Sequence, residues 1–285
     1  MNKINENPDR YVLEKTVTER VLFKKKEFVR YALGDENQNP LTEYIFKEIE
    51  NFDGGYSLAH PAKGKTQVID LNGVQMFPEL TNKYKFSILG DYFMIESMIG
   101  NKGLVSKEGK ILIEPHKSDT FIHVDDYIIY GYNAGNIPNY NKFGLAYIGE
   151  DGFKKLLDCD YNYLEYLGNG FFAVGRYHVT KEREIASLTK DRVTTTVQYA
   201  AAIYSAEKAL ASPNRKIVLT KGLVSDKVFG PLNKTDGGYF TVYFPHVKPI
   251  ELSHMQTSSE AFTGDGLMDL KDAKKVKLNE NFEML

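Results

Sequence analysis

The stretch that decides the fold reads Gly103-Leu104-Val105-Ser106-Lys107-Glu108-Gly109-Lys110-Ile111-Leu112-Ile113-Glu114-Pro115, and it continues after a polar step as Phe121-Ile122-His123-Val124-Asp125-Asp126-Tyr127-Ile128-Ile129-Tyr130. It holds four short apolar runs separated by three turn signals. Short runs rich in β-branched and aromatic residues, bounded by Gly, Pro and Asp, are typical of strands. The stretch therefore predicts short strands joined by tight turns.

A turn with glycine recurs along the chain and gives the first repeat marker. Asn72-Gly73, Glu108-Gly109 and Asp151-Gly152 match one another, and their glycines are 36 and 43 residues apart. Glycine adopts positive φ without a steric cost, which a two-residue hairpin turn requires. Recurrence of such a turn at a period of this size is the signature of a repeat protein.

A second marker is an aromatic residue that directly follows a turn and starts a strand. The aromatics are spaced 36, 35, 44 and 68 residues apart, and the last gap indicates an insertion or a worn repeat. They are Tyr56, Tyr92, Tyr127, Phe171 and Tyr239. A large apolar anchor suits a strand that must bury one face. Two different markers with a shared period strengthen the repeat interpretation.

The predicted fold is all-β, built from tandem repeats of short antiparallel strands. A propeller-like ring and an open β-solenoid both fit, because closure depends on the rotation between repeats. We interpret residues 1–285 as a single β-repeat domain, in which stacked neighbours bury the faces that one repeat leaves exposed. The predicted repeats are 31–66, 67–102, 103–141, 142–201, 202–262 and 263–285.

The phrase that runs from Gly103 to Pro115, together with Lys142-Phe143-Gly144-Leu145, resembles the WG repeat found in many bacterial proteins. The tryptophan after which that family is named is absent, since the chain contains no Trp. The resemblance implies a repeated all-β module that serves as an interaction surface. It implies no catalytic residue for this chain.

Composition narrows the function classes. The net charge is −2, from 36 basic and 38 acidic residues, which gives no overall attraction to nucleic acid or to an anionic membrane. Residues 1–10 lack the apolar segment of a signal peptide, and no apolar run reaches the length of a membrane span. These features predict a cytoplasmic protein with no nucleic-acid or membrane partner. The three consecutive lysines, Lys24 to Lys26, are interpreted as a solvated strand edge.

The repeat pattern breaks at a segment of dense mixed charge, which predicts a long hairpin with a charged tip at residues 176–193. Loops that project from a rigid scaffold are common functional sites. A merely solvated insertion remains the alternative. The candidate partner-binding residues are Arg176, Lys181, Arg183, Glu184, Lys190 and Arg192.

Signatures of catalysis or metal binding are weak. His116, Asp119, His123, Asp125 and Asp126 are close in sequence, but their spacing fits no zinc or calcium pattern. The single cysteine, Cys159, has no local nucleophile motif and is interpreted as a small buried hydrophobe. We therefore expect no catalytic residue, no metal and no cofactor.

Two functions remain open at this point. The first is a non-enzymatic protein-interaction or scaffold module, whose partner is another protein. The second is a glycan-binding or glycan-active protein, in which tyrosines assigned to loops stack on sugars. Those tyrosines are Tyr132, Tyr140, Tyr161 and Tyr163.

Overall fold

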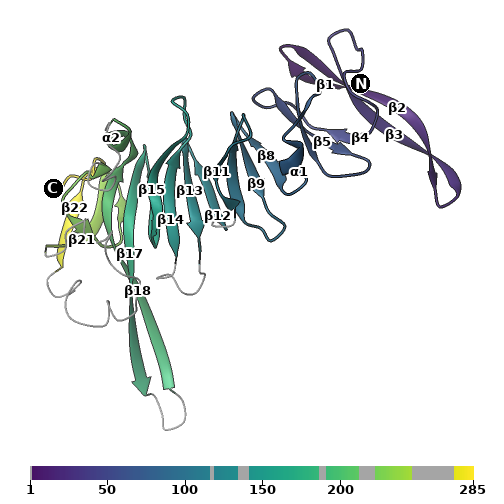
Figure 1. The fold of residues 1–285 in the computed structure, drawn as a ribbon. Helices are drawn as coiled ribbons and strands as arrows, with labels where there is room; N and C mark the ends of the chain where they lie inside the picture. The colour runs from purple at the N-terminus through teal and green to yellow at the C-terminus, as the bar shows by residue number, and fades with distance from the viewer. Residues whose placement is uncertain (1, 116–118, 134–140, 186–190, 212–221, 246–272) are drawn as a thin grey trace. The chain divides into compact units, whose positions relative to one another are not determined.

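The computed structural model describes the chain except residues 1, 116–118, 134–140, 186–190, 212–221 and 246–272, and for residues 177–185 and 191–199 it describes the backbone alone. The chain divides into two compact units, Met1–Asp119 and Thr120–Leu285, where the sequence was interpreted as one domain. Its described strands form four antiparallel sheets, which confirms the all-β prediction (Figure 1). Neither described helix has the length and apolar content of a membrane-spanning segment.

The N-terminal unit contains two sheets and one short helix. The first sheet follows chain order through β1 (Asn2–Glu6), β2 (Asp9–Val21), β3 (Lys24–Gly34), β4 (Phe46–Ile49), β5 (Tyr56–Pro61), β6 (Gln67–Asp70) and β7 (Gln75–Met76). Helix α1 (Pro78–Thr81) leads into the second sheet, which holds β8 (Lys85–Leu89), β9 (Tyr92–Glu96), β10 (Lys102–Ser106) and β11 (Ile111–Ile113). Both sheets are meanders, because each strand pairs with its neighbour along the chain.

The C-terminal unit also contains two sheets. One is a meander of β12 (Thr120–Val124), β13 (Tyr127–Tyr132), β14 (Lys142–Tyr147) and β15 (Lys154–Tyr161). The other contains β16 (Tyr163–Gly168), β17 (Phe171–Ile185), β18 (Asp191–Ser205), β19 (Val228–Phe229), β20 (Asn233–Thr235), β21 (Gly238–Phe244) and β22 (Lys274–Leu278). Helix α2 (Ala206–Leu210) follows β18, and the Ser205 hydroxyl caps it by accepting a hydrogen bond from the Lys208 amide.

The three marker glycines occupy equivalent positions in their sheets. Gly73, Gly109 and Gly152 have φ of 77°, 83° and 82°. Each donates its amide hydrogen to the carbonyl three residues earlier at 2.9 Å. Each also lies between a strand and its antiparallel successor, namely β6 and β7, β10 and β11, and β14 and β15. A turn with a positive-φ glycine is confirmed at all three positions. The expected two-residue turn is wrong, because the pairs that flank these glycines are Ile69 with Gln75, Val105 with Ile111, and Tyr147 with Lys154.

The marker aromatics begin strands as predicted. Tyr56, Tyr92, Tyr127 and Phe171 are the first residues of β5, β9, β13 and β17, and Tyr239 is the second residue of β21. Two-residue turns precede three of them, since Leu89 pairs with Tyr92, Val124 with Tyr127, and Gly168 with Phe171.

The same aromatics also repeat a packing contact between sheets. Tyr56 of β5 meets Phe93 of β9 edge-to-face, with ring centroids 5.0 Å apart and planes at 76°. Tyr127 of β13 meets Phe172 of β17 in the same way, at 5.3 Å and 78°. The two contacts are equivalent. In each unit a marker aromatic of one sheet packs on a phenylalanine of the next sheet, and that phenylalanine directly follows the marker aromatic of its own sheet. Apolar clusters surround both contacts, so each sheet buries a face of its neighbour within the unit.

The glycine in each of the repeated pairs Gly103-Leu104 and Gly144-Leu145 is required for steric reasons. A Cβ added to Gly103 would lie 2.4 Å from the Ile113 carbonyl oxygen, and one added to Gly144 would lie 2.7 Å from that of Leu157. Both oxygens belong to the residue that pairs with the leucine after the glycine, and the strand register shifts at both places. A glycine at a register shift permits close approach of the neighbouring backbone.

The first and last strands of the chain each pair with a strand that is close in sequence. At the N-terminal end, β1 pairs with β2. At the C-terminal end, β22 pairs with β21.

Candidate functional site

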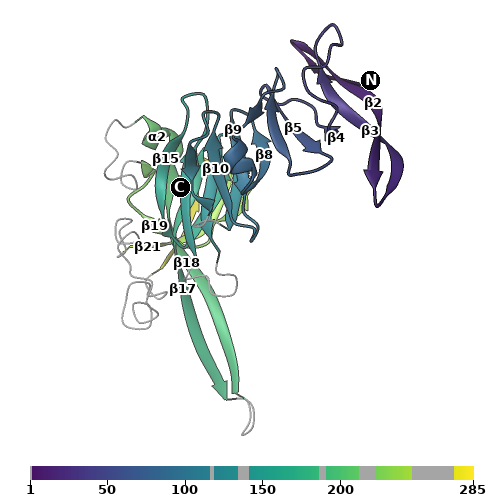
Figure 2. The same ribbon diagram turned by 45° about the vertical axis from the view of Figure 1, so that its right-hand side comes forward.

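The predicted charged hairpin exists and begins earlier than expected. Strands β17 and β18 have 15 residues each. Their register is unbroken from the pair Phe171–Ser205 to the pair Ile185–Asp191. Both ribbon views show the outer part of this hairpin extending beyond the other strands of the C-terminal unit (Figures 1 and 2). We call residues 177–185 and 191–199, the outer parts of these two strands, the arm.

The base of the hairpin belongs to the core of the C-terminal unit. Phe172, Ala173 and Val174 on β17 are fully buried, as are Ala201 and Ile203 on β18. The Phe172 ring contacts the rings of Tyr127 and Tyr166, at centroid distances of 5.3 and 5.1 Å. Because its base is packed on all sides, the arm is a continuation of two core strands and not a separate loop.

Four of the six predicted partner-binding residues lie on the arm. Lys181, Arg183 and Glu184 are on β17, and Arg192 is on β18. In the backbone register Glu184 pairs with Arg192, and Arg183 pairs with Val193. Lys190 lies outside the described residues.

Arg176 occupies the base of the hairpin instead. Its side chain is buried, with 4% exposed, and its guanidinium lies 5.9 Å from the centre of the Tyr161 ring. Burial lowers the pKa of Arg176 from its ordinary value. A side chain in this position packs in the core of the C-terminal unit.

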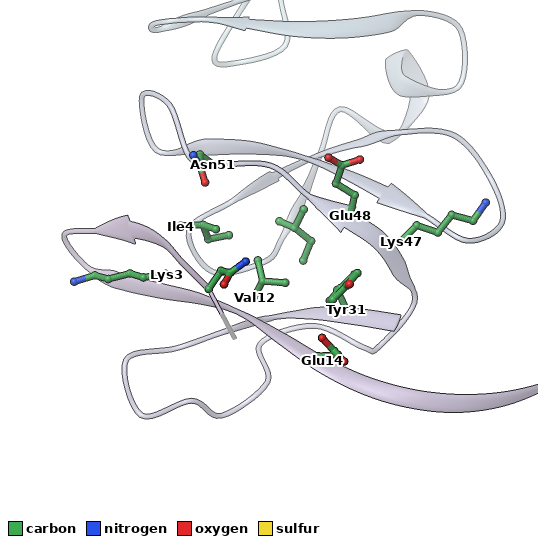
Figure 3. Close-up of a pocket in the computed structure, with 10 residues that line it drawn as sticks. Lys3, Ile4, Val12, Glu14, Tyr31, Lys47, Glu48 and Asn51 are labelled. Atoms are coloured by element: carbon green, nitrogen blue, oxygen red, sulfur yellow. The ribbon is translucent and has the colours of Figure 1, made fainter. Parts of the chain in front are cut away.

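A second candidate site is a hollow of about 560 Å³ in the N-terminal unit (Figure 3). Ile4, Val12 and Tyr31 line its apolar centre, and two lysines and two glutamates lie around them. Lys3 and Lys47 extend away from the centre at opposite ends in Figure 3. A hydrogen bond from Lys3 to Asp9 raises the pKa of Lys3 and lowers that of Asp9. The volume is in the range of small-ligand sites.

A chain of three polar side chains links β5 to the segments on either side of it. The His60 Nε2 lies 2.9 Å from the Glu50 carboxylate, and its Nδ1 lies 3.0 Å from the Thr66 hydroxyl. In the neutral imidazole with hydrogen on Nε2, His60 donates to Glu50 and accepts from Thr66. The arrangement joins the residue after β4, strand β5 and the loop after β5 through ordinary hydrogen bonds.

The residues considered for metal binding do not form a site in the described part of the chain. No group of three or more His, Cys, Asp or Glu side chains there is placed to hold a metal ion. Asp125 has a positive φ in the turn before β13, and its carboxylate accepts a hydrogen bond from the Tyr166 hydroxyl. His116 lies outside the described residues.

Cys159 lies half-buried on β15. Its thiol contacts the Tyr130 carbonyl oxygen at 3.8 Å. Burial raises the pKa of the Cys159 thiol, which disfavours the nucleophilic thiolate. The interpretation as a small apolar side chain agrees with this environment.

The four tyrosines proposed for sugar stacking are not a group of exposed loop residues. Tyr161 and Tyr163 belong to β15 and β16, and Tyr161 is only 5% exposed. Burial raises the pKa of Tyr161 to about 12. Tyr132 ends β13 and is 49% exposed, whereas Tyr140 lies outside the described residues. The assignment of Tyr161 to an exposed loop was wrong, because its side chain packs in the apolar cluster around Phe172.

Comparisons with known proteins give no family for this chain. No family model matches it, and no curated protein matches it. Among solved structures, it is 11% identical to a chain from a complex of S. cerevisiae dbp5 with nup159 and gle1, with a TM-score of 0.28 over 75% of this chain and 65% of that chain. It is 10% identical to the computationally designed Ika8 protein, with a TM-score of 0.24 over 90% of this chain and 89% of that one. Similarities this distant carry no argument about function.

Proposed function

We propose that this chain is a non-enzymatic, WG-like repeat protein that acts as a protein-interaction or scaffold module. The observation that supports the proposal is the arm, whose two strands continue from a packed core and extend beyond it. From Tyr177 to Ile185 each strand adds nine residues, about 30 Å at the usual rise per residue.

The finer architecture belongs to the same proposal. Equivalent glycine turns and equivalent aromatic contacts support a tandem repeat that is similar to the WG repeat. Of the two forms considered, we favour an open β-solenoid over a propeller-like ring. The support is local pairing at both chain ends, where β1 pairs with β2 and β22 pairs with β21.

Two physical properties make the arm suitable for binding a protein. An isolated two-stranded ribbon is only marginally stable in water, so a partner that covers the arm would stabilise it. A ribbon also presents two unpaired strand edges, which can accept another strand through backbone hydrogen bonds. Its mixed charges at Lys181, Arg183, Glu184 and Arg192 would fix the position at which a partner strand aligns with the arm.

Shortening the arm tests this function. Residues 178–198 are replaced by Asn-Gly, which forms a two-residue hairpin turn after the pair Tyr177–Tyr199. Proteins that crosslink to the full chain in its native host extract are identified, and we expect the shortened chain to lose them because their contact surface is gone. Circular dichroism melting checks that the C-terminal unit is intact.

A matched pair of charge reversals completes the test. Lys181→Glu with Arg183→Glu changes the arm, and Lys107→Glu with Lys110→Glu changes an exposed turn of the N-terminal unit. Only the arm variant should weaken partner recovery, by about tenfold when two charged contacts are reversed. Full recovery of every partner by the shortened chain contradicts the proposal.

The alternative, a glycan-binding protein, has one observation in its favour. The hollow in the N-terminal unit combines the Tyr31 ring with Glu14, Glu48 and Asn51 (Figure 3), which are an aromatic face and polar groups of the kind that sugars contact. On a glycan array, Tyr31→Ala should weaken any binding of the full chain about tenfold, because it removes a stacking surface. Tyr132→Ala is the matched control in the C-terminal unit. Binding that depends on Tyr132 and not on Tyr31 rules out the hollow.

A further inference from the structure

The turn between β2 and β3 exposes two large apolar side chains. Leu22 and Phe23 are 88% and 89% exposed and form the two-residue turn that follows the pair of Val21 with Lys24. Both ribbon views place this turn at the far end of the β2–β3 hairpin (Figures 1 and 2). Two adjacent side chains of this size leave a large apolar area in contact with water.

The backbone at this turn contradicts local preference. Leu22 and Phe23 have φ of 46° and 67°, in the left-handed region that Gly, Asn and Asp adopt most easily. A sequence selected for stability alone would place Asn-Gly here. Positions where local preference is broken in this way are commonly functional.

Four cations surround the apolar turn. Arg20, Lys24, Lys25 and Lys26 are all exposed, and no acidic residue lies between positions 20 and 26. Two glutamates flank this segment: Glu19 is held 2.6 Å from Arg30, and Glu27 is exposed next to Lys26. We call residues 20–26 the basic tip. The balanced charge of the whole chain argues against a general attraction to membranes, but the basic tip concentrates positive charge at one place.

We propose that the basic tip docks on the surface of an anionic lipid bilayer. Leu22 and Phe23 enter the boundary between headgroups and acyl chains, and the four cations contact lipid phosphates around them. This inference does not depend on the arm or on the proposed protein partner.

The composition of the tip favours a bilayer over a pocket on another protein. Stable protein interfaces bury about 800 Å² per partner around an apolar centre, and lysine is depleted there. The basic tip offers two apolar side chains, and three of its four cations are lysines. A bilayer interface accepts such a small apolar wedge because the lysine stems reach along it to the headgroups.

Co-sedimentation with vesicles tests the proposal directly. The full chain should bind vesicles of phosphatidylcholine with phosphatidylserine and not vesicles of phosphatidylcholine alone. Phe23→Ser should weaken binding about tenfold or more by removing the apolar wedge. Lys25→Gln should weaken it about fivefold by removing one cation, and added salt should weaken it further.

The turn between β9 and β10 provides a matched control. Met98 and Ile99 are 92% and 83% exposed there, but their neighbours include no cluster of cations. The double variant Met98→Ser, Ile99→Ser should bind vesicles as the unaltered chain does. Equal losses in both variants would show nonspecific adhesion of exposed apolar groups and would overturn the proposal.

A tryptophan reporter gives a second readout, since the chain contains no Trp. The emission of Phe23→Trp should shift to the blue with phosphatidylserine vesicles, and that of Ile99→Trp should not. Absence of both the shift and co-sedimentation overturns the proposal. If Phe23→Ser instead abolishes crosslinking to a protein, the tip docks in a protein pocket and the membrane assignment is wrong.

Discussion

Replacing Phe93 with alanine is expected to lower the free energy of unfolding by about 3–5 kcal/mol. Phe93 is fully buried in the N-terminal unit, between the sheet of β5 and its own sheet. Its ring centroid lies 5.0 Å from that of Tyr56, 5.1 Å from that of Phe77 and 6.2 Å from that of Phe86. Because these rings are themselves held in a packed cluster, they fill only part of the space that alanine leaves, and a cavity remains.

Urea unfolding followed by far-UV circular dichroism measures this effect. Phe23→Ala is the matched control, since the same atoms are removed from a side chain that is 89% exposed, and its cost should be within about 0.5 kcal/mol. If the two substitutions cost the same, Phe93 is not the contact that joins the two sheets, and the proposed stacking of repeats fails in this unit.

The features that could be predicted from the sequence are those fixed by local geometry. Gly73, Gly109 and Gly152 stand where φ is positive, and only a few residue types adopt such a φ easily. The marker aromatics start strands because each directly follows a different tight turn and must bury one face. Both signals are contained in three or four consecutive residues, so they survive in a single sequence.

The features that could not be predicted depend on contacts between distant strands. Arg176 belongs to a charged segment by composition, yet its pairing with Ala200 brings it into the core beside Tyr161. The turn at Leu22 and Phe23 contains none of the usual turn residues, so it could not be predicted from the sequence. The basic tip is visible only once the structure shows that the apolar pair is exposed among its cations.

Replacing Gly175 with alanine is expected to destabilise the C-terminal unit by about 3 kcal/mol or more, near the upper end of overpacking costs. Gly175 lies on β17 at the base of the arm, and an added Cβ would be 2.0 Å from the Ala200 carbonyl oxygen and 2.7 Å from the Ala201 Cα. Both are backbone atoms of the paired strand β18 and cannot rotate away. Relief therefore requires β17 and β18 to separate where the arm is anchored. Thermal and urea unfolding, with hydrogen exchange at 171–176 and 200–205, measure the loss.

Gly168→Ala separates this steric effect from backbone strain. Gly168 is in the same unit with φ of 103°, and no atom lies within 4 Å of its added Cβ. Its cost is that of the strained backbone alone, about 1–2 kcal/mol. Gly175 has no such φ, so its larger cost must come from contact with β18. If Gly175→Ala proves as mild as Gly168→Ala, the two strands have room to shift at their base. The arm would then be a loosely held ribbon, and the argument that a packed core positions it for a partner would fail.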